Sequence, residues 1–195
     1  MITIRLSEKQ VFILKAILGT ILALNAGNYL AFRTDVGFDR TFFVDSIYWF
    51  FPFLCLVIMQ WILSSEYLHK GWVFAGIVGC VLVIFLDGII YFYVPKSVYH
   101  SYFLQVVLLT NFLMGFVATI PQGLLMKNRD GLLWVLANSI GWAFSFLYSN
   151  THFHLFQPIQ SILLMQTLIY HTYNIPLGLL VGLSLYSIKV NYIGK

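Results

Sequence analysis

The chain has 195 residues, of which 60% are hydrophobic and only 9% are charged, and its formal net charge is +4. Soluble globular domains carry about a quarter charged residues, so this composition argues against a soluble protein and predicts that the bilayer solvates most of the apolar surface. The basic residues are scattered, which argues against a nucleic-acid-binding patch, and the two cysteines show neither metal-site nor disulfide-framework spacing.

Apolar runs that suit membrane-spanning helices follow one another along the chain. Such a helix needs about 20 residues. Taken in order, the runs cover roughly 11–32, 42–63, 72–94, 102–125, 132–149 and 163–188. The fifth is short and the sixth is long, and we expect Pro176 to kink the sixth. The first run follows basic residues as a signal peptide would, but its length favours a retained helix. The expected fold class is all-α, polytopic, with six transmembrane helices.

Two segments of the sequence repeat one another. From Gln60 the chain reads QWILSSEYLHKGWVFAGIVG, and from Gln122 it reads QGLLMKNRDGLLWVLANSIG. Matching residues stand at a constant offset of 62: Gln60/Gln122, Leu63/Leu125, Trp72/Trp134, Val73/Val135, Ala75/Ala137 and Gly79/Gly141. Each copy joins the end of one apolar run to the start of the next through a polar turn, so the repeat unit is a helical hairpin.

The whole chain, 1–195, is therefore predicted to be a single transmembrane domain of three tandem hairpins, at about 10–65, 70–127 and 132–190. The register of the third hairpin stays open. An offset of 62 aligns Lys127 with Lys189, whereas the match between IPQGLL at 120–125 and IPLGLL at 175–180 gives an offset of 55. We favour 62, because the apolar run continues to about residue 188.

Basic residues set the orientation of membrane helices. When both termini and the turns at 64–71 and 126–131 are placed on one side, that side holds eight Lys and Arg residues and the other side holds three. The distribution predicts six spans with both termini in the cytoplasm, in a bacterial inner or thylakoid membrane.

Small residues recur on one face of the first predicted helix, at Ala16, Gly19, Ala23 and Gly27. Helices associate in lipid through close packing of such residues. The face has two interpretations, which are packing within the bundle and docking of a partner membrane protein. At the repeated turns, Gln60 and Gln122 are expected to satisfy open backbone groups, and Trp72 and Trp134 are expected to lie at headgroup depth.

Polar side chains inside the apolar runs reach a common level near the predicted outer surface. They are costly in a membrane and need partners. Asp87 is the only acid well inside a run, and at about 1.5 Å per residue it lies in the outer third of its helix. The predicted ligand-binding residues are Asn28, Asp87, Asn111, Asn150, His171 and Asn174. A closed polar network, a ligand or ion site open to the outer face, and a proton relay remain alternatives.

Motifs of familiar enzymes do not occur in the sequence. It contains no HExxH, no GxSxG and no P-loop, so no catalytic residue is predicted. His152 and His154 stand two apart without further ligands, so no metal site is predicted, and the sequence names no cofactor.

The segments after Gln60–Trp61 and Gln122, each with a Trp twelve residues on, resemble those of a loosely defined group of small polytopic membrane proteins of bacteria, common in cyanobacteria, with repeated QW-turn-W segments. Gly123 departs from that pattern, since it stands where a second Trp is expected. The resemblance implies a bacterial source and no mechanism. The layout is also similar to substrate-binding subunits of energy-coupling-factor transporters, which implies partner docking through helix one and substrate binding near the outer face.

The function predicted from the sequence is that of a non-enzymatic integral membrane protein. It either binds a small or lipidic ligand in an outer-facing polar cavity or serves as an accessory subunit of a membrane complex. A substrate-binding or translocating component of a small-molecule transporter is the first alternative, and an intramembrane enzyme is the second.

Overall fold

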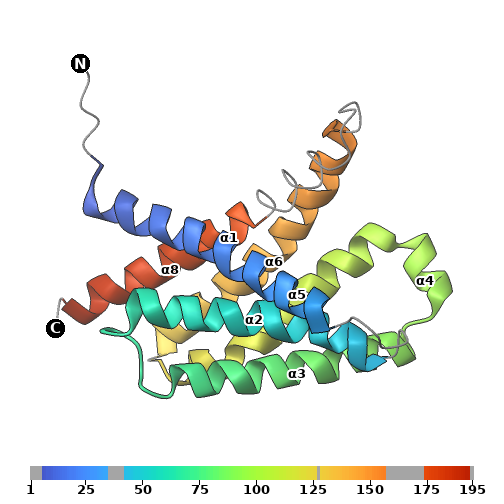
Figure 1. Cartoon of the computed structure of the whole chain (residues 1–195), viewed down its shortest axis with the longest axis horizontal. Helices are drawn as coiled ribbons and strands as arrows, with labels where there is room; N and C mark the ends of the chain where they lie inside the picture. The colour runs from blue at the N-terminus through green and yellow to red at the C-terminus, as the bar shows by residue number, and fades with distance from the viewer. Residues whose placement is uncertain (1–5, 35–41, 127, 157–173, 194–195) are drawn as a thin grey trace.

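A computed structural model describes residues 6–34, 42–126, 128–156 and 174–193, and this part of the chain is all-α. Figure 1 shows the helices in chain order: α1 (Glu8–Thr34), α2 (Phe42–Ser64), α3 (Trp72–Tyr93), α4 (Lys96–Ser101), α5 (Phe103–Leu124), α6 (Asn128–Phe156) and α8 (Ile175–Ile193). Helices α1, α2, α3 and α5 agree within a few residues with the predicted apolar runs, and α8 ends at Ile193, a little beyond the predicted run 163–188, whose residues 163–173 lie outside the described part of the chain. Helix α6 is longer than the predicted run 132–149, because it continues through polar residues at both ends.

In the described part of the chain, four helices are long and apolar enough to cross a membrane: Glu8–Leu30, Trp72–Ile90, Phe103–Leu124 and Ile175–Ile193. Their presence confirms a membrane protein at the level of composition and length. The stretch Phe50–Ser64 of α2 is apolar as well. The interior of α6 carries the buried polar residues Asn138, Ser139 and Ser145.

Two prolines lie at the starts of helices. The short helix α4 follows Pro95, whose φ of −62° and ψ of 139° place it directly before the first helical turn. Pro176 lies in the first turn of α8, where a proline lacks no needed N–H group and does not distort the helix. The predicted kink concerns the run 163–188, and residues 163–173 of it lie outside the described residues.

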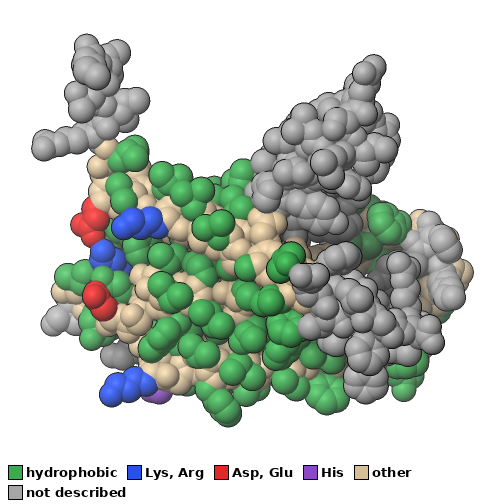
Figure 2. All heavy atoms as spheres, viewed as in Figure 1, with side chains coloured by type: hydrophobic (Ala, Val, Ile, Leu, Met, Phe, Trp, Pro, Cys, Tyr) green, Lys and Arg blue, Asp and Glu red, His purple; other side chains and the backbone are tan. Residues whose placement is uncertain are grey.

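The long helices form a closed ring by their contacts. Each packs against two others, in the order α1, α2, α3, α5, α6, α8 and back to α1. The start of α1, the end of α8 and the α2–α3 turn all lie at one end of the molecule (Figure 1). Figure 2 shows the coloured charged side chains gathered at that same end, which we call the charged end, while hydrophobic side chains cover the length of the ring.

Glycines allow the closest approaches between neighbouring helices. A Cβ on Gly79 of α3 would overlap the carbonyl oxygen of Ala118 on α5, and a Cβ on Gly131 of α6 would overlap that of Gly123. Helix pairs in lipid gain little from burying apolar surface, because acyl chains are equally apolar. Glycines have no side chain and let helix backbones touch. This close contact is therefore a principal source of attraction between the helices of this ring.

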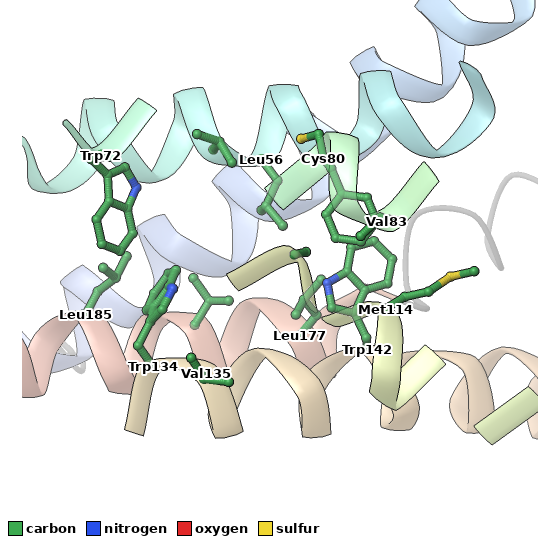
Figure 3. Close-up of a cluster of buried hydrophobic side chains, with 14 of the residues drawn as sticks. Leu56, Trp72, Cys80, Val83, Met114, Trp134, Val135, Trp142, Leu177 and Leu185 are labelled. Carbon is green, nitrogen blue, oxygen red and sulfur yellow. The ribbon is translucent and has the colours of Figure 1, made fainter. Parts of the chain in front are cut away.

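Large side chains fill the inside of the ring, so that its interior is closely packed (Figure 3). Trp72 and Trp134 are fully buried, with ring centroids 4.9 Å apart at 65°. Further along the ring, Phe53 stacks on Trp142 at 4.5 Å and 30°. Leu177 and other aliphatic residues pack around both pairs. The interior therefore contains two aromatic pairs, with buried polar groups distributed among them.

Candidate functional site

Asn174 is the most buried of the predicted ligand-binding residues. Its side chain is 0% exposed, and neither its Nδ2 nor its Oδ1 has a hydrogen-bond partner among the described residues. One turn further along α8, the N–H of Leu177 donates to Ser145 Oγ of α6 at 3.2 Å. Asn174 stands 17 residues before Asn191 at the charged end, which corresponds to about 26 Å of helix. It therefore lies towards the opposite end of the ring.

A second buried polar group stands on α1 at a neighbouring contact. Thr20 is 0% exposed, and its Oγ1 has no hydrogen-bond partner in the described part of the chain. Gly178, one turn after Asn174, packs directly against Ile17 and Thr20. Where α8 contacts α1, the Thr20 hydroxyl, which has no partner among the described residues, therefore lies close to the helical turn that begins at Asn174. The sequence analysis did not select Thr20, because a lone threonine in an apolar run is common.

The other predicted ligand-binding residues differ in their environments. Asn111 is buried, and its Nδ2 donates to Val107 O on its own helix at 2.9 Å. Asn28 on α1 and Asp87 on α3 are half-buried, and Asp87 is engaged in an interaction within the protein. Asn150 lies on α6 with its side chain outside the described residues, and His171 also lies outside them. A shared cavity lined by all six residues stays a prediction.

The repeated Gln and Trp residues lie inside the ring, not at its lipid-facing surface. Trp72 and Trp134 are 0% exposed, so they do not face lipid, and their headgroup depth stays a prediction. The Nε1 of Trp134 donates to Gln122 Oε1 at 3.3 Å, which links α6 to α5. The equivalent groups of the first copy, Trp72 Nε1 and Gln60 Oε1, have no hydrogen-bond partner among the described residues. The tryptophans contact each other because the α2–α3 and α5–α6 turns meet at the charged end.

Ser184 is a further buried polar residue, and the repeat spacing relates its position to those of the two glutamines. It is 2% exposed and stands 62 residues after Gln122, as Gln122 stands 62 after Gln60. Its Oγ donates to Val181 O at 2.9 Å. Extending the offset of 62 into the third hairpin was the signal that would have selected it.

A pocket of about 290 Å³ opens at the charged end. The α2–α3 turn, the end of α5, the start of α6 and the end of α8 line it, through Glu66, Tyr67, Leu68, His69, Leu125, Met126, Asp130, Ile188, Asn191 and Tyr192. This pocket could not be foreseen from the sequence, because its lining comes from three separate segments, and the repeat that relates the first two does not show that they meet the end of α8.

The small-residue face of α1 packs within the chain. Ala16 is 0% and Ala23 is 8% exposed, Gly19 lies against Met59 of α2, and Gly27 lies against the backbone of Pro52. Gly182 of α8 contacts Ala16 from the other side. These contacts favour the bundle-packing interpretation of the face, and docking of a partner protein there stays a prediction.

The described residues contain no group of three or more His, Cys, Asp or Glu side chains that could hold a metal ion. No protein-family model matches the chain, and no curated protein and no solved structure matches it. The resemblances to the QW-turn-W group and to energy-coupling-factor subunits therefore stay predictions, and the function has to be argued from the site itself.

Proposed function

We propose that the protein is a six-span membrane protein of three tandem helical hairpins that binds a small or lipidic ligand through buried polar groups towards the end opposite the charged end. The observation that carries this proposal is the side chain of Asn174, which is fully buried with both polar atoms unpaired among the described residues. Burying an amide without hydrogen bonds costs several kcal/mol, on the order of 2–7. A ligand that donates and accepts at this point would remove that cost.

The ring supports six spans. Helix α2 lies between α1 and α3, and α6 lies between α5 and α8, so each is flanked by two helices that are long and apolar enough to cross a membrane. A helix held between two spanning neighbours shares their surroundings. Its backbone groups are satisfied within the helix, as the bilayer requires.

Equivalent glycine contacts support the three hairpins. Gly19, Gly79 and Gly141 are spaced by 60 and 62 residues and stand on the first helix of each predicted hairpin. Each packs against the second helix of its own hairpin, through Met59, Ala118 and Leu177 respectively. A common close approach at corresponding positions is what tandem duplication of a hairpin produces.

The charged end supports the cytoplasmic placement of both termini. The start of α1 and the end of α8 lie there with the α2–α3 turn (Figures 1 and 2), and the positive-inside rule places such an end in the cytoplasm. Asn174 is then nearer the outer leaflet, and Thr20 lies near the middle of the span Glu8–Leu30. Because both are uncharged, the groups they recognise on a ligand are neutral hydrogen-bonding groups such as hydroxyls or amides.

Replacing Asn174 by leucine tests the proposal. The protein is purified in a maltoside detergent, and the compounds that copurify are extracted and quantified by mass spectrometry. We expect Asn174→Leu to lower the molar ratio of a copurifying compound at least tenfold, since about 1.4 kcal/mol of binding is a factor of ten. After exhaustive delipidation, the same variant should melt at or above the wild-type temperature, because leucine removes an unpaired buried amide.

Gln10→Leu is the matched control, since it removes an exposed amide at the charged end, away from Asn174 and outside the pocket lining, and the variant should retain the compound. A delipidated Asn174→Leu protein that melts well below wild type, with no compound bound to either protein, would instead identify Asn174 as part of a closed packing network. That outcome would reject ligand binding at this level.

Translocation is the second candidate function. Unpaired buried polar atoms also occur near the charged end, at Gln60 Oε1, Ser64 Oγ and Trp72 Nε1, in the described part of the chain. Polar groups lie towards both ends of the ring, with aromatic pairs among them. This arrangement is compatible with a path for a substrate that opens first at one end of the ring and then at the other. The intramembrane enzyme stays the remaining alternative, and the residues that the structure describes hold no group of three His, Cys, Asp or Glu side chains that would favour it.

A further inference from the structure

The pocket at the charged end lies far from Asn174 along the ring and requires a separate explanation. Two carboxylates, Glu66 and Asp130, line it together with the rings of Tyr67 and Tyr192. Its remaining surface is mostly apolar, from Leu68, Leu125, Met126 and Ile188. We infer that this pocket binds the ammonium group of a small organic cation. The inference is independent of the proposed function, because it uses different residues at the other end of the molecule.

The charges of the lining favour a cation. Its residues include two acids and neither Lys nor Arg. The neighbouring Lys189, whose Nζ lies 5.7 Å from the Tyr67 ring centroid, is neutralised by its ion pair with Glu8. Asp130 Oδ1 accepts a hydrogen bond from Asn191 Nδ2 at 2.8 Å, which fixes the carboxylate in place. His69 Nδ1 accepts the N–H of Gly71 at 3.0 Å.

The tyrosines supply the second element of ammonium recognition. Their ring centroids are 5.8 Å apart at an angle of 65°, so the two rings form adjoining walls. The Tyr67 ring already attracts an ammonium from the chain itself, because Lys189 Nζ lies 5.7 Å from its centroid. Aromatic rings attract ammonium groups through the negative potential of their faces, and carboxylates beside them strengthen the attraction.

Size and floor indicate an organic cation and not a metal ion. The volume of about 290 Å³ corresponds to the lower end of pockets that hold small organic ligands. The apolar floor offers contact to methyl and methylene groups. Calcium requires about six to eight oxygen ligands, whereas the described residues form no group of three potential acidic or histidine ligands.

Choline and its neutral isostere 3,3-dimethyl-1-butanol test the inference on the full-length protein in maltoside micelles. Saturation-transfer NMR of the methyl signals reports binding, at constant ionic strength. We expect choline to bind at least tenfold more tightly than the neutral isostere. The double variant Glu66→Gln/Asp130→Asn should weaken choline binding at least tenfold and leave the isostere unchanged. Tyr192→Leu, at a half-exposed wall, should weaken choline several-fold.

Lys9→Gln is the control for surface charge. It changes one exposed charge at the same end, outside the pocket lining, and should leave choline binding unchanged. Equal binding of choline and the isostere, or unchanged choline binding in the double variant with wild-type melting temperature, overturns the inference. Nanodiscs of phosphatidylglycerol with and without phosphatidylethanolamine then identify the source: competition with choline assigns the ammonium to a lipid headgroup, and its absence assigns it to a soluble cation.

Discussion

At the scale of single residues, the two copies of the Gln–Trp motif show that one sequence pattern has two hydrogen-bonding outcomes. Both glutamines are 1% exposed and both tryptophans 0%. Gln122 accepts the indole N–H of Trp134, whereas Gln60 Oε1 and Trp72 Nε1 stay unpaired among the described residues. The difference affects the free energy of unfolding. Removing Gln122 leaves the buried Trp134 N–H without a partner, which is costly, whereas removing the unpaired oxygen of Gln60 costs little.

We therefore expect Gln122→Leu to be more destabilising than Gln60→Leu, by about 1–2 kcal/mol, since it leaves the buried Trp134 N–H without an acceptor. Unfolding in mixed micelles with increasing SDS measures both free energies, and the two variants serve as controls for one another because the sequence changes are identical. Equal losses would show that the 3.3 Å contact between Trp134 and Gln122 contributes nothing to stability.

At the scale of helix pairs, equivalent glycines have different neighbours. A Cβ on Gly79 would overlap the backbone carbonyl of Ala118, which cannot move without separating α3 from α5. A Cβ on Gly19 would lie 2.8 Å from Met59 Sδ, near the end of a flexible side chain that can change rotamer. Gly19 and Gly79 stand at matching positions of the proposed repeat, but they are expected to tolerate replacement by alanine to different degrees.

Gly79→Ala should destabilise the protein by about 3 kcal/mol, and Gly19→Ala by less than about 1 kcal/mol, because overpacking against backbone is costlier than against a methionine. The melting temperatures of the purified variants, followed by tryptophan fluorescence in one detergent, measure the difference. A Gly79→Ala protein as stable as Gly19→Ala would mean that α3 and α5 do not approach as closely as the structure describes.

At the scale of the whole molecule, the ends of the chain close the ring. Gly178 and Gly182 of α8 pack against Ile17 and Ala16 of α1. At the charged end, Lys189 pairs with Glu8, with its Nζ 5.6 Å from the Phe12 ring centroid. The first and last helices are therefore neighbours, and the outside of the ring is left apolar for lipid while polar groups lie within.

Six spans make a specific prediction for thiol labelling in spheroplasts of a bacterial host, in a background with Cys55→Ala and Cys80→Ala. Ser65→Cys, in the α2–α3 turn, should react with a membrane-impermeant maleimide only after permeabilisation, and Ser97→Cys, in α4, should react in intact spheroplasts. If α2 does not cross the membrane, the pattern reverses, with Ser65→Cys reactive in intact spheroplasts and Ser97→Cys protected.

Much of the candidate site lay beyond what the sequence predicts. Asn174 could be selected because a polar side chain inside a predicted apolar run is costly in a membrane and needs a partner. Its lack of a partner could not be foreseen, since this depends on which faces of α1 and α6 meet α8. Trp72 and Trp134 were assigned to the membrane interface because the sequence does not indicate that the α2–α3 and α5–α6 turns pack together.

The sequence by itself determined the all-α membrane class, the approximate positions of the long helices and the charged end, because the length and apolarity that a bilayer demands are local properties of a segment. Only the tertiary structure decided that α1 meets α8 in a closed ring, that the repeated tryptophans are buried against each other, and that acids and tyrosines from three segments enclose one pocket. Those relations depend on how backbone contacts at glycines orient each helix about its axis, and no single segment specifies that orientation.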